Sequence, residues 1–109
     1  MAVVLLAMVP AAGSGGTVAS ELLARAAAEG AVRVIVGLRL PAGATADVAA
    51  IAGVRAAVLR AIAGTRHRVV RTYDTIPFVA LEASVETLQA LAAAPEVSSV
   101  EEDALARPN

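Results

Sequence analysis

Residues 32–40 (VRVIVGLRL) alternate between aliphatic and other side chains, and this alternation constrains the fold more than any other feature of the sequence. Successive side chains of an extended strand point to opposite faces, so the aliphatic members of the segment share one face. These members are Val32, Val34, Val36, Leu38 and Leu40. The intervening residues, which include Arg33 and Arg39, share the other face. We therefore expect a strand that joins a core on one side and meets solvent or a partner on the other.

The segments that follow predict a complete α+β domain. Apolar residues recur with helical spacing in some segments, and β-formers cluster in others. The expected elements are a strand at residues 32–40, a helix at 47–63, strands at 66–74 and 77–83, a helix at 84–94 and a strand at 97–103. This order is that of the ferredoxin-like βαββαβ sandwich, in which a four-stranded antiparallel sheet carries two helices on one face. The opposite face of such a sheet is uncovered and is open to a partner.

Two further expectations concern the helices. In the helix at residues 47–63, we expect the inward stripe to begin at Val48 and to be interrupted by Arg55. A short additional helix is expected at residues 17–29, with Ser20 near its start as a cap. Few residues of this short helix are large and apolar, so we expect residues 17–30 to be peripheral to the domain.

Residues 1–16 contain an apolar run, AVVLLAMVPAA, followed by a glycine-rich break. The run is too short to span a membrane, for which about 20 apolar residues are needed. It is similar to the apolar region of a secretory signal, with small residues at Ala11 and Ala12 for cleavage, although the usual basic region before it is missing. Two interpretations stay open: a secretory signal, which makes the protein secreted or extracytoplasmic, and a disordered leader.

Composition and local motifs indicate a protein without catalytic chemistry. The chain has 109 residues, which suits one domain, and a formal net charge of −1, which does not favour nucleic acid as a partner. It has no cysteine, and its one histidine, His67, has no orienting carboxylate or nucleophile near it in the sequence. We therefore expect no enzyme activity, no metal site and no cofactor. Arg66, Arg68 and Arg71 form a basic patch, which we interpret as the solvated edge of a strand.

Three acidic residues, Glu101, Glu102 and Asp103, end the last expected strand. Such a cluster can act as an acid–base pair or hold a divalent ion, and it is often only a solvated turn. A third interpretation fits the strand better, because Glu101 and Asp103 alternate onto one side of it. From that side, both carboxylates can meet the N-termini of a partner's helices, which present unsatisfied N–H groups and the positive end of the helix dipole.

Four segments of the chain resemble the propeptides of subtilisin-type proteases. Residues 32–36 (VRVIV) are similar to the first strand of that family, and residues 73–81 (YDTIPFVAL) are similar to its tyrosine-led hairpin. Residues 88–91 (LQAL) are similar to part of its last helix, and residues 95–103 (PEVSSVEED) to the proline and the Val-Glu-x-Asp signature that follow. The resemblance covers residues 32–109.

The resemblance implies an inhibitor and intramolecular chaperone of a subtilisin-like serine endopeptidase, acting as a pro-region in cis or as a free protein in trans. Residues 31–103 are then the inhibitory domain. Its sheet packs on two surface helices of the protease, whose N-termini are capped by Glu101 and Asp103. Residues 104–109 are an extended tail that occupies the substrate cleft. The tail residues are Ala104, Leu105, Ala106, Arg107, Pro108 and Asn109, of which the last lies nearest the catalytic serine.

An alternative function stays open at the level of the sequence. A ferredoxin-like domain can also be a regulatory or oligomerisation module that binds a small ligand or its own copy through the sheet. The composition of residues 41–45 (PAGAT) does not indicate a ligand-binding loop. The two functions differ in the tail, which an inhibitor needs and an oligomerisation module can lose.

Overall fold

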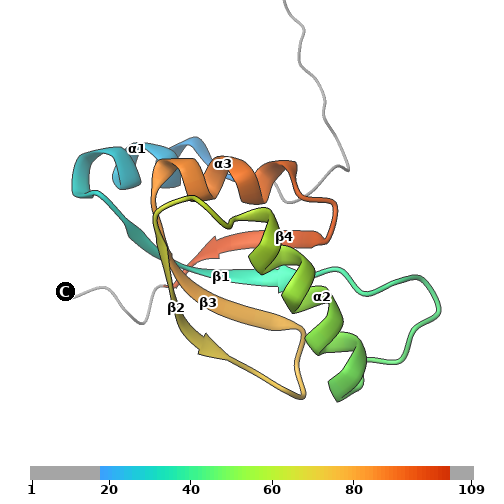
Figure 1. Ribbon diagram of the computed structural model, residues 1–109. Coiled ribbons are helices and arrows are strands. Elements are labelled where there is room, and N and C mark those ends of the chain that lie inside the picture. Colours follow the sequence, from blue (N-terminus) through green and yellow to red (C-terminus); the bar gives the residue numbers. More distant parts are fainter. Residues whose placement is uncertain (1–17, 104–109) are drawn as a thin grey trace, which may run out of the picture.

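The computed structural model describes residues 18–103, and these form an α+β domain (Figure 1). Its elements are α1 (Ser20–Glu29), β1 (Val32–Leu38), α2 (Val48–Ala61), β2 (His67–Thr72), β3 (Phe78–Ala83), α3 (Val85–Ala93) and β4 (Val97–Glu102). All the strand pairs are antiparallel, and the strands lie in the order β2-β3-β1-β4. The order of elements and the order of strands confirm the predicted ferredoxin-like fold.

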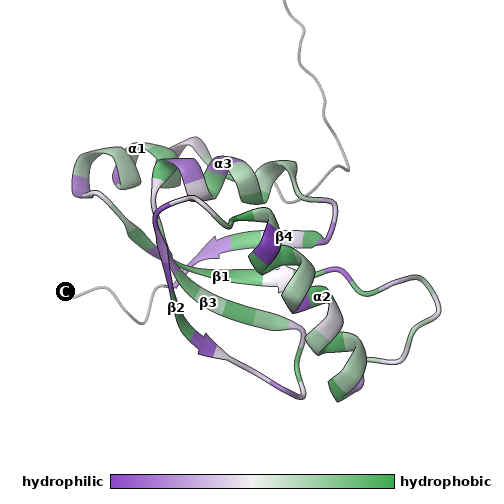
Figure 2. Cartoon of the chain, in the orientation of Figure 1, coloured by the Kyte–Doolittle hydropathy of each residue, from purple (hydrophilic) through white to green (hydrophobic). Residues whose placement is uncertain are grey.

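The hydrophobic core lies between the sheet and the helices. The alternation at β1 has the predicted consequence, because Val34 and Val36 are fully buried under the helices. Partners from the other elements complete the core; the fully buried ones include Ile51, Val58, Ile62, Val79, Leu81, Leu88, Leu91 and Val97. Figure 2 shows the apolar character concentrated along β1 and β3, in the middle of the sheet, and more polar character on β2.

The starts of α2 and α3 are fixed by side-chain caps. The Asp47 carboxylate accepts a hydrogen bond of 2.8 Å from the backbone N–H of Ala50. The Ser84 hydroxyl accepts one of 3.3 Å from the N–H of Thr87. Each bond satisfies a backbone donor that the first turn of a helix leaves without a partner. These two caps mark where the helices begin.

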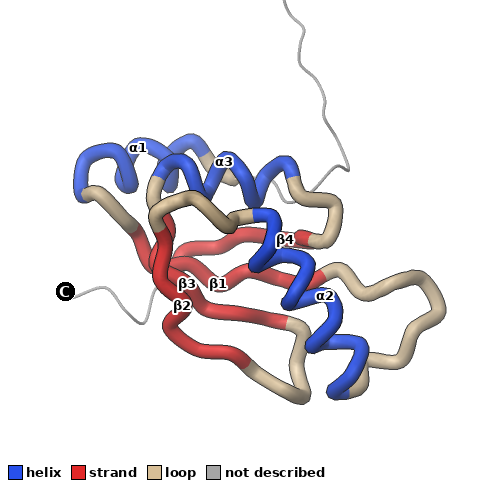
Figure 3. The backbone as a smooth tube through the Cα atoms, viewed as in Figure 1, coloured by secondary structure: helices blue, strands red, loops and turns tan. Residues whose placement is uncertain are grey.

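The prediction for α1 was wrong in two respects. Ser20 is the first residue of the helix, not its cap, and the capping position belongs to Ala19, which makes no side-chain bond. The helix is also not peripheral, because Leu22 and Ala26 are 6% and 1% exposed within the core. α1 lies beside α3 and contacts β1 (Figures 1 and 3), so three helices cover this face of the sheet. Alanine adds little apolar surface, which is why the sequence pattern understated this contact.

The stripe predicted along α2 also needs correction. Val48 is 56% exposed, while Val54, which lies one position before Arg55, is buried in the core. The Arg55 guanidinium instead reaches the β2–β3 loop, where it donates a hydrogen bond of 3.0 Å to the Tyr73 carbonyl and pairs with Asp74 at 3.9 Å. Arg55 therefore leaves the apolar stripe intact and holds the loop beside it.

Candidate functional site

The sheet face opposite the helices is the candidate site, and we call it the outer face. Arg33, Ile35 and Gly37 lie on it, because they alternate in β1 with the valines that enter the core. Backbone pairing then places one residue of each neighbouring strand beside each of them. Two rows result, each crossing all four strands in the order β4, β1, β3, β2. The first row is Glu101, Ile35, Ala80 and Arg71. The second row is Asp103, Arg33, Glu82 and Arg68.

The two carboxylates singled out in the sequence both lie on this face. Glu101 is exposed and pairs with Ile35 across the β1–β4 ladder. The N–H of Asp103 donates a hydrogen bond of 3.0 Å to the Arg33 carbonyl, which extends the ladder by one residue beyond β4. Since Arg33 and Ile35 share the outer face, so do their partners. Glu101 and Asp103 thus stand on the same side of an edge strand.

Glu102, between them, belongs to the opposite side of β4. It pairs in the ladder with Val34, which faces the core, and its carboxylate forms an ion pair with Arg25 of α1. A cavity of about 270 Å³ lies between α1 and β4, and its lining includes Leu22, Arg25 and Val100. Sequence reasoning missed the pair between Arg25 and Glu102, because no local motif joins residues so far apart in the chain. The acidic cluster is therefore divided between the two faces of the sheet.

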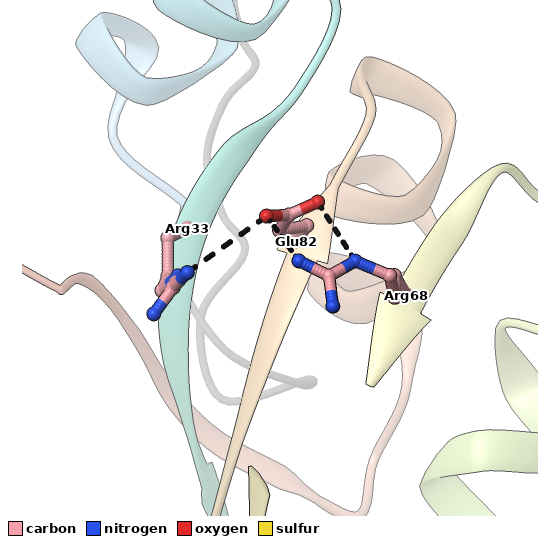
Figure 4. A network of polar contacts seen from close by, with 3 residues as sticks. All are labelled: Arg33, Arg68 and Glu82. Carbon is pink, nitrogen blue, oxygen red and sulfur yellow. Dashed lines mark hydrogen bonds and ion pairs between the residues drawn. The ribbon is translucent and has the colours of Figure 1, made fainter. Parts of the chain in front are cut away.

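A network of charges crosses the second row of the outer face (Figure 4). Arg68 binds Glu82 through two hydrogen bonds, from Nε to Oε1 at 3.2 Å and from Nη2 to Oε2 at 2.7 Å. Arg33 approaches the same carboxylate from the other side, with Nη2 3.9 Å from Oε2. The hydrogen bonds from Arg68 lower the pKa of Glu82, and Glu82 in turn raises the pKa of Arg68. Glu82 and Arg68 therefore stabilise each other in their charged forms.

The three arginines of the basic patch predicted at β2 have different environments in the structure. Arg68 is committed to Glu82, whereas Arg71 is exposed and lies on the outer face opposite Ala80. A register shift between Val69 and Arg71 is what brings Arg71 to this face. Arg66 precedes β2 in the chain. The outer face consequently has a basic side at β2 and an acidic side at β4, and the central strands carry a narrow apolar strip beside the charged residues Arg33 and Glu82.

The apolar strip belongs to the two central strands. Its accessible members are Ile35 and, beyond it, Phe78, which is 37% exposed, whereas Ala80 beside Ile35 is only 3% exposed. Gly37 pairs with Phe78 in the ladder. A Cβ atom at Gly37 would lie 2.5 Å from Oγ of Ser99 and 2.6 Å from Oγ of Ser98, so the hydroxyls of these two β4 residues fill the space over Gly37.

His67 is part of a structural network. Its Nδ1–H donates a hydrogen bond of 2.9 Å to the carbonyl of Thr65, and the Thr65 hydroxyl lies 3.4 Å from the same nitrogen. In the ladder between β2 and β3, His67 pairs with Ala83, whose side chain is buried in the core. Within residues 18–103, no three His, Asp or Glu side chains gather in a way that would hold a metal ion.

The predicted tail at residues 104–109 and the predicted leader at residues 1–16 lie outside the described residues. In the part of the chain that the structure describes, none of the helices is both long and apolar enough to cross a membrane. Comparison of the chain with protein-family models, with curated proteins and with solved structures gives no match.

Proposed function

We propose that this chain is an inhibitor and intramolecular chaperone of a subtilisin-like serine endopeptidase, acting in cis as a pro-region or in trans. The observation that carries the proposal is the position of Glu101 and Asp103 on the outer face, immediately before the tail. The resemblance of residues 32–109 to subtilisin-type propeptides supports it. In this function the domain comprises residues 31–103, and it acts outside the cytoplasm.

The outer face suits a partner surface that presents helix N-termini. The first N–H groups of a helix have no partner within the helix, and the helix dipole makes that end positive. A carboxylate held on a rigid strand supplies both an acceptor and a negative charge. Glu101 and Asp103 stand on one side of β4, so each can meet one of two neighbouring helices of a protease.

The tail at residues 104–109 completes the mechanism. An extended peptide inhibits a protease when its backbone pairs with the edge strands of the substrate cleft. The domain, once docked, holds the tail next to the cleft and raises its effective concentration, so weak contacts of the tail suffice. In cis, the same docked domain offers the folding protease a surface on which to assemble its own helices.

Inhibition kinetics with and without the tail test this function. The full chain is compared with a chain that ends at Asp103, and with a chain of full length whose residues 104–109 are replaced by glycine and serine. We expect the full chain to inhibit a subtilisin-like protease and both altered chains to lose most of that inhibition. If the full chain fails against several such proteases, the proposed function is wrong and the fold is unaffected.

A further inference from the structure

On the outer face, positions that are mirrored across the line between β1 and β3 carry charges of opposite sign. In the first row, acidic Glu101 stands at the β4 end and basic Arg71 at the β2 end. In the second row, the signs run negative, positive, negative, positive from Asp103 to Arg68. Each residue of one half therefore has a residue of opposite charge, or of matching apolar character, at the mirrored place in the other half.

A two-fold axis that runs parallel to the strands, along the line between β1 and β3, turns this pattern into self-complementarity. Such a rotation lays the outer face of a second copy on the first, with β4 over β2 and β1 over β3. Glu101 then meets Arg71 of the second copy, and Ile35 lies over the position of Ala80, which is itself only 3% exposed. The same contacts occur twice, as a two-fold interface requires. In the second row, Arg33 meets Glu82 of the second copy, which is again a pair of opposite charges.

The rotation also determines what Phe78 meets. Phe78 on β3 is partly exposed on the outer face, and its ladder partner Gly37 on β1 lies beneath the hydroxyls of Ser98 and Ser99. The rotation lays β3 on β1, so each Phe78 ring meets these serine hydroxyls of the other copy. Sheets packed face to face lie about 10 Å apart, which side chains of this size can fill.

We propose that two copies of this chain pair through their outer faces as a symmetric dimer, with Glu101 of each copy against Arg71 of the other. This inference does not rest on the proposed protease, since the complementarity lies within one chain. It concerns the same face, however, so a dimer would hide Glu101 and Asp103 from a protease. In a free inhibitor, the dimer would then cover the surface that binds the protease, and dissociation of the dimer would expose it.

The size of the face makes the dimer weak and sensitive to salt. Strands about 4.8 Å apart, with a rise of about 3.4 Å per residue, give a face of about 20 Å by 20 Å. The projected area is then roughly 400 Å², below the roughly 800 Å² that each partner of a standard interface buries. Exposed charge pairs are screened over about 10 Å at 0.1 M salt. We therefore expect dimers at high protein concentration and low ionic strength.

Sedimentation equilibrium of the full chain over a range of concentrations tests the proposal. Arg71→Glu places like charges at both contacts of the dimer, and so does Glu101→Arg. Each substitution should weaken self-association by about tenfold or more, because every dimer contains the contact twice. Glu29→Arg and Arg60→Glu are matched controls, since they make the same charge changes at exposed positions on α1 and α2. These controls should leave self-association unchanged.

A mixing experiment isolates the proposed geometry. Chains with Arg71→Glu and chains with Glu101→Arg should each associate poorly alone and should form heterodimers when mixed. The combined variant, with both changes in one chain, should self-associate as the original does. Residues 71 and 101 lie on opposite edge strands, so within one chain they do not contact each other. A chain that stays monomeric at millimolar concentration and low salt overturns the proposal, as does a mixture that behaves like its separate components.

Discussion

Arg25 of α1 forms an ion pair with Glu102 of β4, and this contact joins the N-terminal helix to the strand that carries the candidate site. Both side chains are only partly exposed, at 28% and 23%. Leu22, one turn before Arg25, is buried against the same end of the sheet. α1 is thus a structural part of the domain, and it supports β4 from the side opposite to Glu101.

The first prediction follows from the burial of α1. Leu22→Ala should lower the free energy of unfolding by about 2–4 kcal/mol, because it removes a buried side chain and leaves a cavity. Leu23→Ala is the matched control, since Leu23 is only partly buried against the core. Urea denaturation of both variants measures the difference. Equal and small effects of the two substitutions would mean that α1 is peripheral after all.

The order of elements could be predicted from the sequence because it depends on local signals. The alternation from Val32 to Leu38 and the helical spacing of apolar residues in the later segments each act within a few residues. The place of α1 could not be predicted in the same way. Besides Leu22, its contacts come from Ala26, which carries little apolar surface, and from the long-range pair between Arg25 and Glu102.

The candidate site was predictable only along a single strand. That Glu101 and Asp103 share a side follows from the two-residue period of any strand. Which residues stand beside them depends on the pairing of strands. At β2 this pairing includes a register shift between Val69 and Arg71, and without it Arg71 would lie on the other face. No property of the isolated β2 sequence signals that shift, so the acidic–basic row could not be foreseen.

A second prediction concerns Thr87, the buried polar residue of the core. Its hydroxyl donates a hydrogen bond of 2.8 Å to the Arg66 carbonyl and lies 2.8 Å from the Thr65 hydroxyl. Thr87→Val keeps the shape and removes the donor, which should cost about 2 kcal/mol of stability. Thr87→Ser keeps the hydroxyl and loses a methyl group, which should cost about 1 kcal/mol. Thermal or urea unfolding would contradict this account if serine proved more costly than valine.

The third prediction is a pH dependence at Glu82. Its pKa is lowered in the folded protein, mainly by the hydrogen bonds from Arg68. Ionised Glu82 therefore stabilises the fold at pH values above the ordinary glutamate pKa of 4.5, and this stabilisation is lost as the pH falls through the lower pKa of the folded state. Glu82→Gln should be less stable than the original chain at neutral pH.

The difference between the two chains should shrink steadily as the pH falls below 4.5, because protonated glutamate and glutamine are alike in charge. Urea unfolding at a series of pH values measures this difference. Glu86→Gln, at an exposed position in the first turn of α3, controls for the removal of one carboxylate. A difference that stays constant down to strongly acidic pH would show that Arg68 does not hold Glu82 in its ionised form.

The last prediction addresses the two carboxylates of the outer face. Glu101→Ala combined with Asp103→Ala should weaken the inhibition of a subtilisin-like protease, because two helix N-termini of the protease lose their caps. One cap contributes about 1 kcal/mol, so the inhibition constant should rise about 10- to 30-fold for two. Urea unfolding of the isolated variant separates a loss of docking from a loss of stability, and the backbone bond from the N–H of Asp103 to Arg33 is kept in it.

Glu29→Ala combined with Glu86→Ala provides the matched control for this test. Both residues are exposed on helices, and their loss changes the net charge by the same amount without touching the outer face. If only the first pair of substitutions weakens inhibition, the effect depends on position and not on overall charge. Equal inhibition by the two double variants would remove Glu101 and Asp103 from the docking surface, and the tail alone would then have to account for inhibition.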